Sequence, residues 1–259
     1  MPSSATETRV TPPHLTPDAA LFLDLDGTLL ELADRPAAVA ADDALRGRLV
    51  TLTHALGGAV AVVSGRAIND LDRILRPLVL PAAGQHGIEW RDATRHRRQH
   101  PTPTLPAETL AELDLFVAAH PGTLLESKGA SFAVHFRGRP DAARAVATIL
   151  ADAARDAGPG WEVLQGKMMT ELRPAGVHKG DGIRRLLADP PFAGRRPVFV
   201  GDDWTDEDGF VAVNALQGIS VAVAVERETQ ARYRLDGVAA VHDWLDRSAA
   251  ALSPTRERG

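Results

Sequence analysis

The chain has 259 residues, a length that suits one large domain or a core with a smaller insert. Its hydrophobic fraction of 44% and charged fraction of 24% are typical of a globular protein and argue against wholesale disorder. The net charge of -5 argues against a nucleic-acid-binding protein, and the lack of cysteine excludes disulfides, thiolate metal sites and cysteine nucleophiles.

The two ends of the chain carry no targeting signal that the sequence reveals. Residues 1–18 are rich in Pro, Ser and Thr and contain no apolar segment of the signal-peptide type, so we expect a short disordered tail. A second short tail is expected over 251–259. Because no run of about 18 apolar residues is present to span a membrane, a cytoplasmic protein without membrane partners is the default expectation.

Lysine is unusually rare in this chain. Of the 29 basic residues, 26 are Arg and only three are Lys, at positions 128, 167 and 179. Lys is expected to persist where a compact ammonium with three donors does what a planar guanidinium cannot. A functional motif proposed below is therefore supported if it contains one of the three lysines.

The first part of the chain predicts a parallel sheet. Residues 21–25 are apolar apart from Asp24 and lead into a Gly-containing turn, which is the pattern of a buried strand. A helix is predicted over 42–56 and a second buried strand over 59–63. Two buried strands joined through a helix favour parallel pairing, because antiparallel strands normally leave one face to solvent.

The middle of the chain has a different pattern, in which polar and apolar residues alternate. In 131–137 one face of the expected strand carries Phe132, Val134 and Phe136, and the other carries Ser131, His135 and Arg137. In 167–173 a polar face is formed by Lys167, Glu171 and Arg173. Helices are predicted over 106–119 and 140–157 to cover the apolar face. We therefore expect a small α+β domain over 101–176.

The last part of the chain returns to the first pattern. A helix is predicted at 183–187, and buried strands are predicted at 198–200 and 219–225. The two ends together predict one doubly wound α/β core, formed by 19–100 and 177–250, which the α+β insert interrupts.

Carboxylates cluster where the predicted parallel strands end. Asp24 and Asp26 lie at the carboxyl end of the first strand, at the edge of the sheet where ligands bind in open α/β folds. Asp202 and Asp203 follow the strand at 198–200 in the same way. The alternative interpretation is structural: Asp24 in a turn, and Asp206 as a first-turn carboxylate favoured by the helix dipole.

Two phosphate donors accompany these acids. Ser64 follows the strand at 59–63, and Lys179 begins a predicted helix. A hydroxyl, an ammonium and a helix N-terminus are suited to phosphate, whereas clustered carboxylates suit a hard cation such as Mg²⁺. Acids together with phosphate donors predict metal-assisted phosphoryl transfer.

Four segments of the chain resemble the four motifs of the haloacid dehalogenase superfamily and occur in the same order. They contain Asp24, Ser64, Lys179 and Asp202, respectively. The resemblance implies that Asp24 is the nucleophile that forms an aspartyl phosphate and that Asp26 is the general acid and base. It also implies Mg²⁺ bound by Asp24, the Asp26 carbonyl and Asp202, with Ser64 and Lys179 on the phosphoryl oxygens. Supporting positions are implied for Thr28, Asp203 and Asp206, with Asp203 expected to anchor Lys179 or the metal shell.

The insert resembles the cap domain of trehalose-6-phosphate phosphatases. Lys128, Ser131, His135 and Arg137 match the motif KxxSxxxHxR, and 166–174 match GKxxxExRP; a QHG loop at 85–87 also fits that family. The resemblance implies a phosphorylated disaccharide as substrate and closure of the cap over the core. The implied substrate contacts are Arg66, His86, Lys128, Ser131, His135, Arg137, Lys167, Glu171 and Arg173.

Each of these residues also has a structural interpretation. The insert's polar residues can form an ordinary solvated face, His86 can bond a loop carbonyl, and Arg66 can pair with an acid of the core. The set as a whole favours sugar recognition, because the remaining two lysines, 128 and 167, open the two cap motifs. Alternative functions are a phosphatase for sucrose 6-phosphate or mannosyl-3-phosphoglycerate, a phosphomutase, and a non-catalytic sugar-phosphate sensor.

Overall fold

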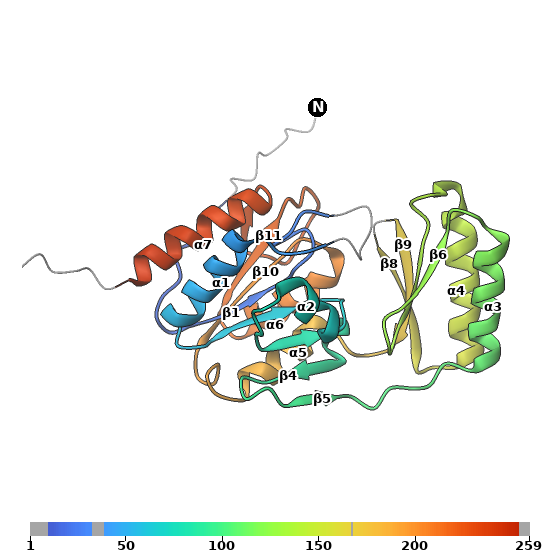
Figure 1. Ribbon diagram of the computed structural model, residues 1–259, viewed down its shortest axis with the longest axis horizontal. Helices are drawn as coiled ribbons and strands as arrows, with labels where there is room; N and C mark the ends of the chain where they lie inside the picture. The colour runs from blue at the N-terminus through green and yellow to red at the C-terminus, as the bar shows by residue number, and fades with distance from the viewer. Residues whose placement is uncertain (1–9, 33–38, 167, 254–259) are drawn as a thin grey trace, which may run out of the picture. The chain divides into compact units, whose positions relative to one another are not determined.

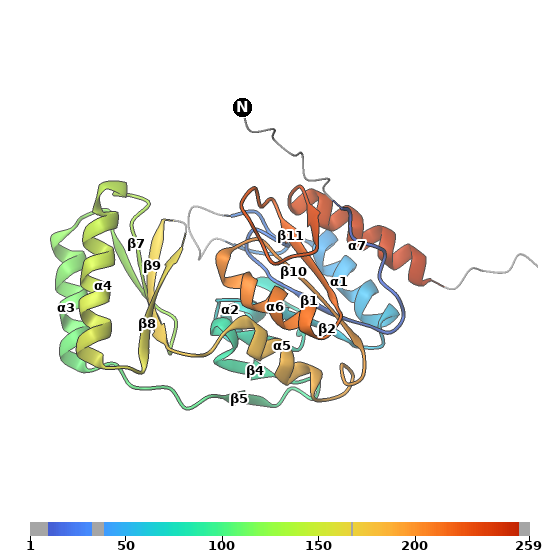
Figure 2. The same ribbon diagram turned by 180° about the vertical axis from the view of Figure 1, so that it is seen from behind.

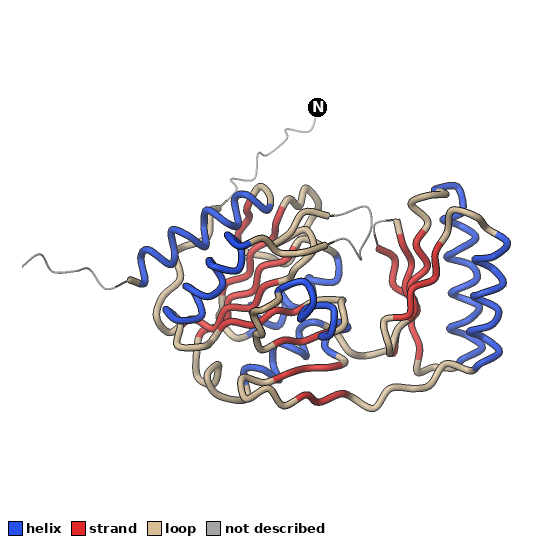
Figure 3. Tube along the Cα trace, in the orientation of Figure 1, coloured by secondary structure: helices blue, strands red, loops and turns tan. Residues whose placement is uncertain are grey.

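The computed structural model describes residues 10–32, 39–166 and 168–253. The chain divides into two compact units, one formed by Met1–Arg98 with His178–Gly259 and the other by Gln99–Val177. Figure 3 shows that both units contain strands and helices, which agrees with the α/β fold class expected from the sequence. The two units are described separately below.

A mixed sheet forms the centre of the first unit. In the described part of the chain it has eight strands in the order β12-β11-β10-β1-β2-β3-β4-β5. The strands are β1 (Ala19–Leu23), β2 (Val60–Val63), β3 (Ala82–Gly84), β4 (Glu89–Arg91), β5 (Arg97–Gln99), β10 (Arg196–Gly201), β11 (Ile219–Val223) and β12 (Tyr233–Leu235). Pairing is parallel from β12 through to β3, and β4 is antiparallel to β3. This parallel core is the predicted doubly wound sheet.

Helices cover this sheet on both faces, as its fully buried strands require. They are α1 (Asp43–Ala55), α2 (Ile68–Leu75), α5 (Lys179–Leu187), α6 (Glu207–Ala215) and α7 (Val238–Leu252). Helices α1 and α7 pack against each other, as do α5 and α6, and the second pair comes to the front in Figure 2. Every residue of β1, β2 and β11 is buried, so apolar side chains on both sides of the sheet form one core.

The second unit is a four-stranded antiparallel sheet backed by two helices. Its strand order is β6-β7-β9-β8, and the described elements are β6 (Leu124–Ser127), β7 (Phe132–His135), β8 (Trp161–Gly166), β9 (Met169–Pro174), α3 (Ala107–Ala119) and α4 (Ala143–Ala157). Figure 1 shows α3 and α4 on one face of this sheet. Val134 and Phe136 pack there with Leu172, Val146 and Leu150, as the alternating pattern predicts.

Within the described residues, short helical turns also connect the main elements. They are η2 (Gln85–Gly87), η3 (Pro140–Ala142) and η4 (Trp204–Asp206). The first and last of these follow β3 and β10, so they lie in the loops at the carboxyl ends of those strands. The structure therefore places two short turns where the sequence predicts the site.

The expected N-terminal tail, 1–18, is wrong for its last nine residues. Leu15 is buried, and its N–H donates to Ser248 Oγ at 3.2 Å. The Trp244 indole N–H donates to the Pro13 carbonyl at 3.0 Å. These residues are ordered because they cover apolar side chains of α7, which composition alone does not reveal. Residues 1–9 and 254–259 lie outside the described residues, and so does Lys167.

No helix in the described segments is both long enough and apolar enough to cross a membrane.

Candidate active site

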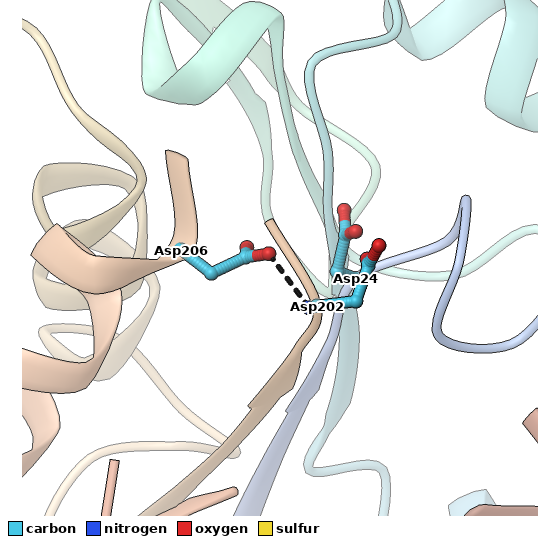
Figure 4. A group of neighbouring side chains, drawn as sticks. All are labelled: Asp24, Asp202 and Asp206. Carbon is cyan, nitrogen blue, oxygen red and sulfur yellow. Dashed lines mark hydrogen bonds between the residues drawn. The ribbon is translucent and has the colours of Figure 1, made fainter. Parts of the chain in front are cut away.

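Two neighbouring parallel strands bring Asp24 and Asp202 together. Leu23 of β1 lies opposite Val200 of β10, and the Asp24 N–H donates to the Val200 carbonyl at 2.9 Å. Asp24 and Asp202 each follow their strand by one residue. Figure 4 shows the two carboxylates side by side at this edge of the sheet, with Asp206 approaching from a neighbouring loop. Asp24 is 4% exposed, so water has little access to it.

The turn after Asp26 is shaped to receive the Asp202 carboxylate. Gly27 has φ +81°, and a Cβ at this position would lie 2.0 Å from Asp202 Oδ2. Only glycine fits there, because a side chain would collide and would also strain the backbone. The buried Thr28 hydroxyl donates to Asp202 Oδ1 at 3.2 Å. Thr28 therefore contacts the Asp202 carboxylate directly.

Lys179 is the first residue of α5, and its ammonium is buried. Nζ lies 2.9 Å from Asp24 Oδ1 and 2.6 Å from Asp206 Oδ1. Gly180 allows this approach, because a Cβ there would lie 2.6 Å from the Asp208 carbonyl in α6. The close packing of the two helices thus positions the ammonium against both acids.

Asp206, rather than Asp203, anchors Lys179. Asp203 Oδ1 instead accepts the Trp204 N–H at 2.7 Å and caps η4. Asp206 is fully buried, and its Oδ2 accepts the N–H groups of Asp202 and Asp203, both at 2.9 Å. The sequence expectation gave Asp203 either Lys179 or the metal shell as its contact, because spacing alone cannot tell which acid the turn of η4 directs inward.

Burial and charge perturb the acids of this cluster. Burial raises the pKa of Asp24 well above its usual range, while the Lys179 ammonium acts to lower it. Burial and repulsion from Asp206 raise the pKa of Asp202 to about 7. Burial lowers the pKa of Lys179, but Asp206 and Asp24 outweigh burial and raise it above its ordinary value. Lys179 therefore stays charged.

The acidic cluster fits a hard cation. One oxygen from each of Asp24, Asp202 and Asp206 lies within 4.8 Å of the others. Both oxygens of Asp206 already accept protein hydrogen bonds, from Lys179 and from backbone N–H groups. Asp24 and Asp202 therefore remain as the carboxylates best able to bind a metal ion, and oxygen ligands of this kind suit Mg²⁺.

Ser64 enters the same site from β2. Its N–H donates to the Ala83 carbonyl at 2.9 Å, which fixes the loop that follows the strand. The side chain is 2% exposed, and its Oγ accepts the Arg66 N–H at 3.2 Å, so the hydroxyl proton is not used in this bond. Ser64 follows β2 by one residue, and β2 pairs directly with β1, the strand that ends before Asp24.

Arg66 pairs with Asp26. Its Nε lies 2.5 Å from Asp26 Oδ2 and its Nη2 lies 2.7 Å from Asp26 Oδ1. This is the second of the two interpretations that the sequence left open for Arg66. The contact joins the loop after β1 to the loop after β2, and it fixes the plane of the Asp26 carboxylate.

His86 is buried in η2 with φ +58°, an uncommon backbone conformation for a residue other than glycine. Its N–H donates to the Ser64 carbonyl at 3.0 Å. A Cβ at Gly65 would lie 2.7 Å from the imidazole, so the ring packs directly on the Ser64 loop. This contact explains why the QHG segment lies beside the site although it is distant from Ser64 in sequence.

Glu171 is the centre of the polar cluster in the second unit. Its Oε1 accepts the Ser131 hydroxyl at 2.5 Å, and its Oε2 lies 3.2 Å from Lys128 Nζ. Glu171 and Ser131 are each 1% exposed and Arg173 is 5% exposed. The alternative interpretation, an ordinary solvated face, therefore does not fit these three residues, because all three are buried.

Two acids that the sequence analysis missed hold basic residues of this cluster. Glu162 of β8 lies 2.7 Å from Arg173 Nη2, and Glu126 of β6 lies 2.7 Å from His135 Nε2. The only sequence signal for either acid is its alternation with apolar residues in a strand. Arg137 is exposed just after β7. Five of the implied substrate residues, Lys128, Ser131, His135, Glu171 and Arg173, thus contact one another or one of these two further carboxylates.

The chain matches the family model described as trehalose-phosphatase over residues 22–239. It is 39% identical over 253 residues to the trehalose-6-phosphate phosphatase of Escherichia coli (strain K12), covering 97% of this chain and 94% of that protein. It is 44% identical over 205 residues to a probable trehalose-phosphate phosphatase of Sinorhizobium fredii, covering 79% of this chain and 77% of that one. The fold is similar to that of the C. albicans trehalose-6-phosphate phosphatase C-terminal domain, with a TM-score of 0.80 at 22% identity over 91% of this chain and 93% of that one.

Proposed function

The chain belongs to the trehalose-phosphatase family, and we propose that it hydrolyses trehalose 6-phosphate with Asp24 as the nucleophile and Mg²⁺ as the cofactor. The fold is that of a haloacid dehalogenase-type phosphatase, and the substrate is a small phosphorylated sugar. The observation that carries the proposed mechanism is the contact of the Lys179 ammonium with the Asp24 carboxylate, at 2.9 Å, in a buried acidic cluster.

In the proposed first step, an Asp24 oxygen forms a bond to phosphorus and the bond from phosphorus to the sugar oxygen breaks. Asp26 transfers its proton to the departing sugar oxygen. In the second step, water attacks the aspartyl phosphate, Asp26 takes a proton from that water, and Asp24 is released. Ser64 and Lys179 are the donors that hold the phosphoryl oxygens as negative charge develops on them.

Asp24, Asp202 and the Asp26 carbonyl would hold Mg²⁺, which supplies positive charge to offset that of the phosphoryl group. Asp206 orients this site without being a ligand, since it holds Lys179 and the backbone of Asp202 and Asp203. Thr28 limits the rotation of Asp202 through its hydrogen bond. The four carboxylates thus have separate tasks.

We propose that residues 101–176 form the cap that selects the sugar. The support is the cluster around Glu171, in which carboxylates, a hydroxyl, an ammonium and a guanidinium offer both donors and acceptors. Sugars present many hydroxyl groups, and a site built to bond them discriminates strongly against analogues that lack them. We also propose that the reaction takes place in the cytoplasm.

A panel of sugar phosphates tests this proposal. We expect the protein with Mg²⁺ to release inorganic phosphate from trehalose 6-phosphate far faster than from sucrose 6-phosphate, mannosyl-3-phosphoglycerate or glucose 6-phosphate. Equal rates on all four would contradict the substrate assignment but leave the phosphatase mechanism intact. Binding of trehalose 6-phosphate without phosphate release would instead support a sensor.

A further inference from the structure

The side chains of Arg66 and Asp26 form an ion pair with two hydrogen bonds between the loops that follow β1 and β2. The guanidinium Nε and Nη2 each donate to a different oxygen of the carboxylate, at 2.5 and 2.7 Å. The Arg66 side chain is only 14% exposed and that of Asp26 is 26% exposed. Two parallel hydrogen bonds to one carboxylate fix its plane as well as its position, which a single contact does not.

The backbone of Arg66 is held as firmly as its side chain. Its N–H donates to Ser64 Oγ at 3.2 Å, and its carbonyl accepts the Gln85 N–H at 2.9 Å. A Cβ at Gly84 would lie 2.9 Å from that carbonyl, so the loop has little room to move. The guanidinium therefore extends from a fixed support rather than from a loose surface loop.

We infer that Arg66 is a positioning residue for proton transfer, which orients the Asp26 carboxyl toward the leaving oxygen and does not itself bind the phosphoryl group. This inference rests on the proposed function, in which Asp26 donates a proton to the sugar oxygen. Each carboxyl oxygen has two acceptor sites, and the guanidinium fork occupies one on each oxygen. Because the fork uses one site on each oxygen, the second site of one oxygen can hold the proton that moves to the sugar oxygen as its bond to phosphorus breaks.

The nature of the leaving group separates this role from phosphate binding. A sugar alkoxide is a poor leaving group and needs the proton, whereas p-nitrophenolate is a stable anion that departs without one. Loss of a phosphate contact slows both substrates equally. Loss of the orientation of Asp26 slows the sugar phosphate selectively. The ratio kcat/KM is the correct quantity, because it covers the steps up to phosphoryl transfer and excludes hydrolysis of the aspartyl phosphate.

A matched control exists on the far side of the same unit. Arg48 of α1 forms a fork of the same kind with Asp246 of α7, at 2.6 and 2.8 Å, and its side chain is also 14% exposed. Arg48→Gln removes an ion pair of the same geometry that has no part in the proposed chemistry, although the Asp246 side chain is 56% exposed against 26% for Asp26. It reports what the loss of such a pair does to the fold alone.

The experiment measures kcat/KM of wild type, Arg66→Gln, Asp26→Asn and Arg48→Gln with trehalose 6-phosphate and with p-nitrophenyl phosphate. For Arg66→Gln we expect a loss of about 100-fold on the sugar phosphate and less than about 5-fold on the aryl phosphate, because a general acid typically contributes 10²–10⁴-fold. Asp26→Asn should show the same selectivity, and Arg48→Gln should change neither substrate. Arg66→Lys, which keeps the charge without the fork, should recover only part of the loss.

Inorganic phosphate serves as a second probe, as a competitive inhibitor. Its inhibition constant should be unchanged in Arg66→Gln. Equal losses of kcat/KM on the two substrates, together with weaker inhibition by phosphate, would overturn the inference and indicate that Arg66 contacts the phosphoryl group. No loss on either substrate would also overturn it, because the ion pair would then have no role in catalysis. If wild type cleaves glycerol phosphate and p-nitrophenyl phosphate but not trehalose 6-phosphate, the substrate assignment fails, and the same comparison on glycerol phosphate still tests Arg66.

Discussion

Lys179 and Asp24 are 155 positions apart in the sequence, yet the ammonium of the first lies 2.9 Å from the carboxylate of the second. The ammonium comes from the first turn of α5 and the carboxylate from the end of β1. Because Asp206 accepts a second hydrogen bond from the same ammonium, one positive charge is shared by two buried acids. This shared charge determines how the site responds to mutation and to pH.

Replacing Lys179 with Met should destabilise the fold as well as abolish activity. The change leaves Asp24 and Asp206 buried without their cation, and breaking a buried pair typically costs about 3–5 kcal/mol. We expect the loss in the free energy of unfolding to be larger at pH 8 than at pH 5, because burial raises the pKa of Asp24 and favours its neutral form at the lower pH. Urea unfolding at the two pH values checks this, with Lys179→Arg as the variant that keeps the charge. An equal loss at both pH values would contradict the shared-charge interpretation.

Replacing Asp24 with Asn should abolish turnover and leave the fold intact. The amide cannot form the aspartyl phosphate, so we expect a rate below about one thousandth of wild type. Burial raises the pKa of Asp24, so its ionised form is unfavourable in the folded protein, and a neutral amide should not lower the melting temperature at pH 8 without metal. Phosphate release and thermal unfolding measure the two effects. Activity near that of wild type would exclude the aspartyl-phosphate route.

The metal-free protein should become more stable as the pH falls from 8 toward 5. The pKa of Asp202 is raised to about 7 in the folded state from an ordinary value of 3.8. The folded state therefore binds a proton more tightly than the unfolded state between these values, and the penalty for ionised Asp202 is fully present only above pH 7. The pKa of Asp24 is raised in the same direction. Melting temperatures in EDTA across this range measure the effect, and a fall in stability over the same range would contradict it.

Magnesium should reverse this pH dependence. The cation binds ionised carboxylates, so Mg²⁺ should raise the melting temperature more at pH 8 than at pH 6. A free Mg²⁺ concentration of about 100 times its dissociation constant should add about 2.7 kcal/mol to the free energy of unfolding. Asp202→Asn should lose this stabilisation at both pH values. A shift in the variant as large as that of wild type would show that the ion binds elsewhere.

Replacing Glu171 with Gln should affect the sugar substrate alone. The amide keeps the shape but loses the charge that Lys128 and Ser131 contact. A charged hydrogen bond contributes about 1.5–3 kcal/mol, so kcat/KM for trehalose 6-phosphate should fall about 10- to 100-fold. The rate on p-nitrophenyl phosphate should be unchanged. Glu112→Gln, on the exposed face of α3, is the control. Equal losses on both substrates would contradict a role of Glu171 in sugar selection.

The sequence predicted the elements of the core with small errors at their ends. The strand expected at 21–25 is observed as Ala19–Leu23, and the helix expected at 42–56 is observed as Asp43–Ala55. Both agree because buried parallel strands are apolar throughout and helices have a regular apolar period, so each leaves a signal in a short window. The strand tips, and with them Asp24 and Asp202, follow from the same pattern.

Contacts between side chains from different elements left no such signal in the sequence. Composition and spacing could not show that Asp206, not Asp203, holds Lys179, or that Glu162 and Glu126 contact Arg173 and His135. These contacts depend on which side chain a turn directs inward and on the register of neighbouring strands. Register is set by the packing of the whole sheet and not by a local window of sequence.

The sequence by itself determined the fold class, the family resemblance and the types of residue at the site, because each depends on local patterns and on motifs in order. The tertiary structure alone decided the partnerships: Lys179 with both Asp24 and Asp206, and Arg66 with Asp26. The physical reason is that charge is shared through space over a few ångströms. Segments far apart in the chain reach those distances only when the strands and helices pack.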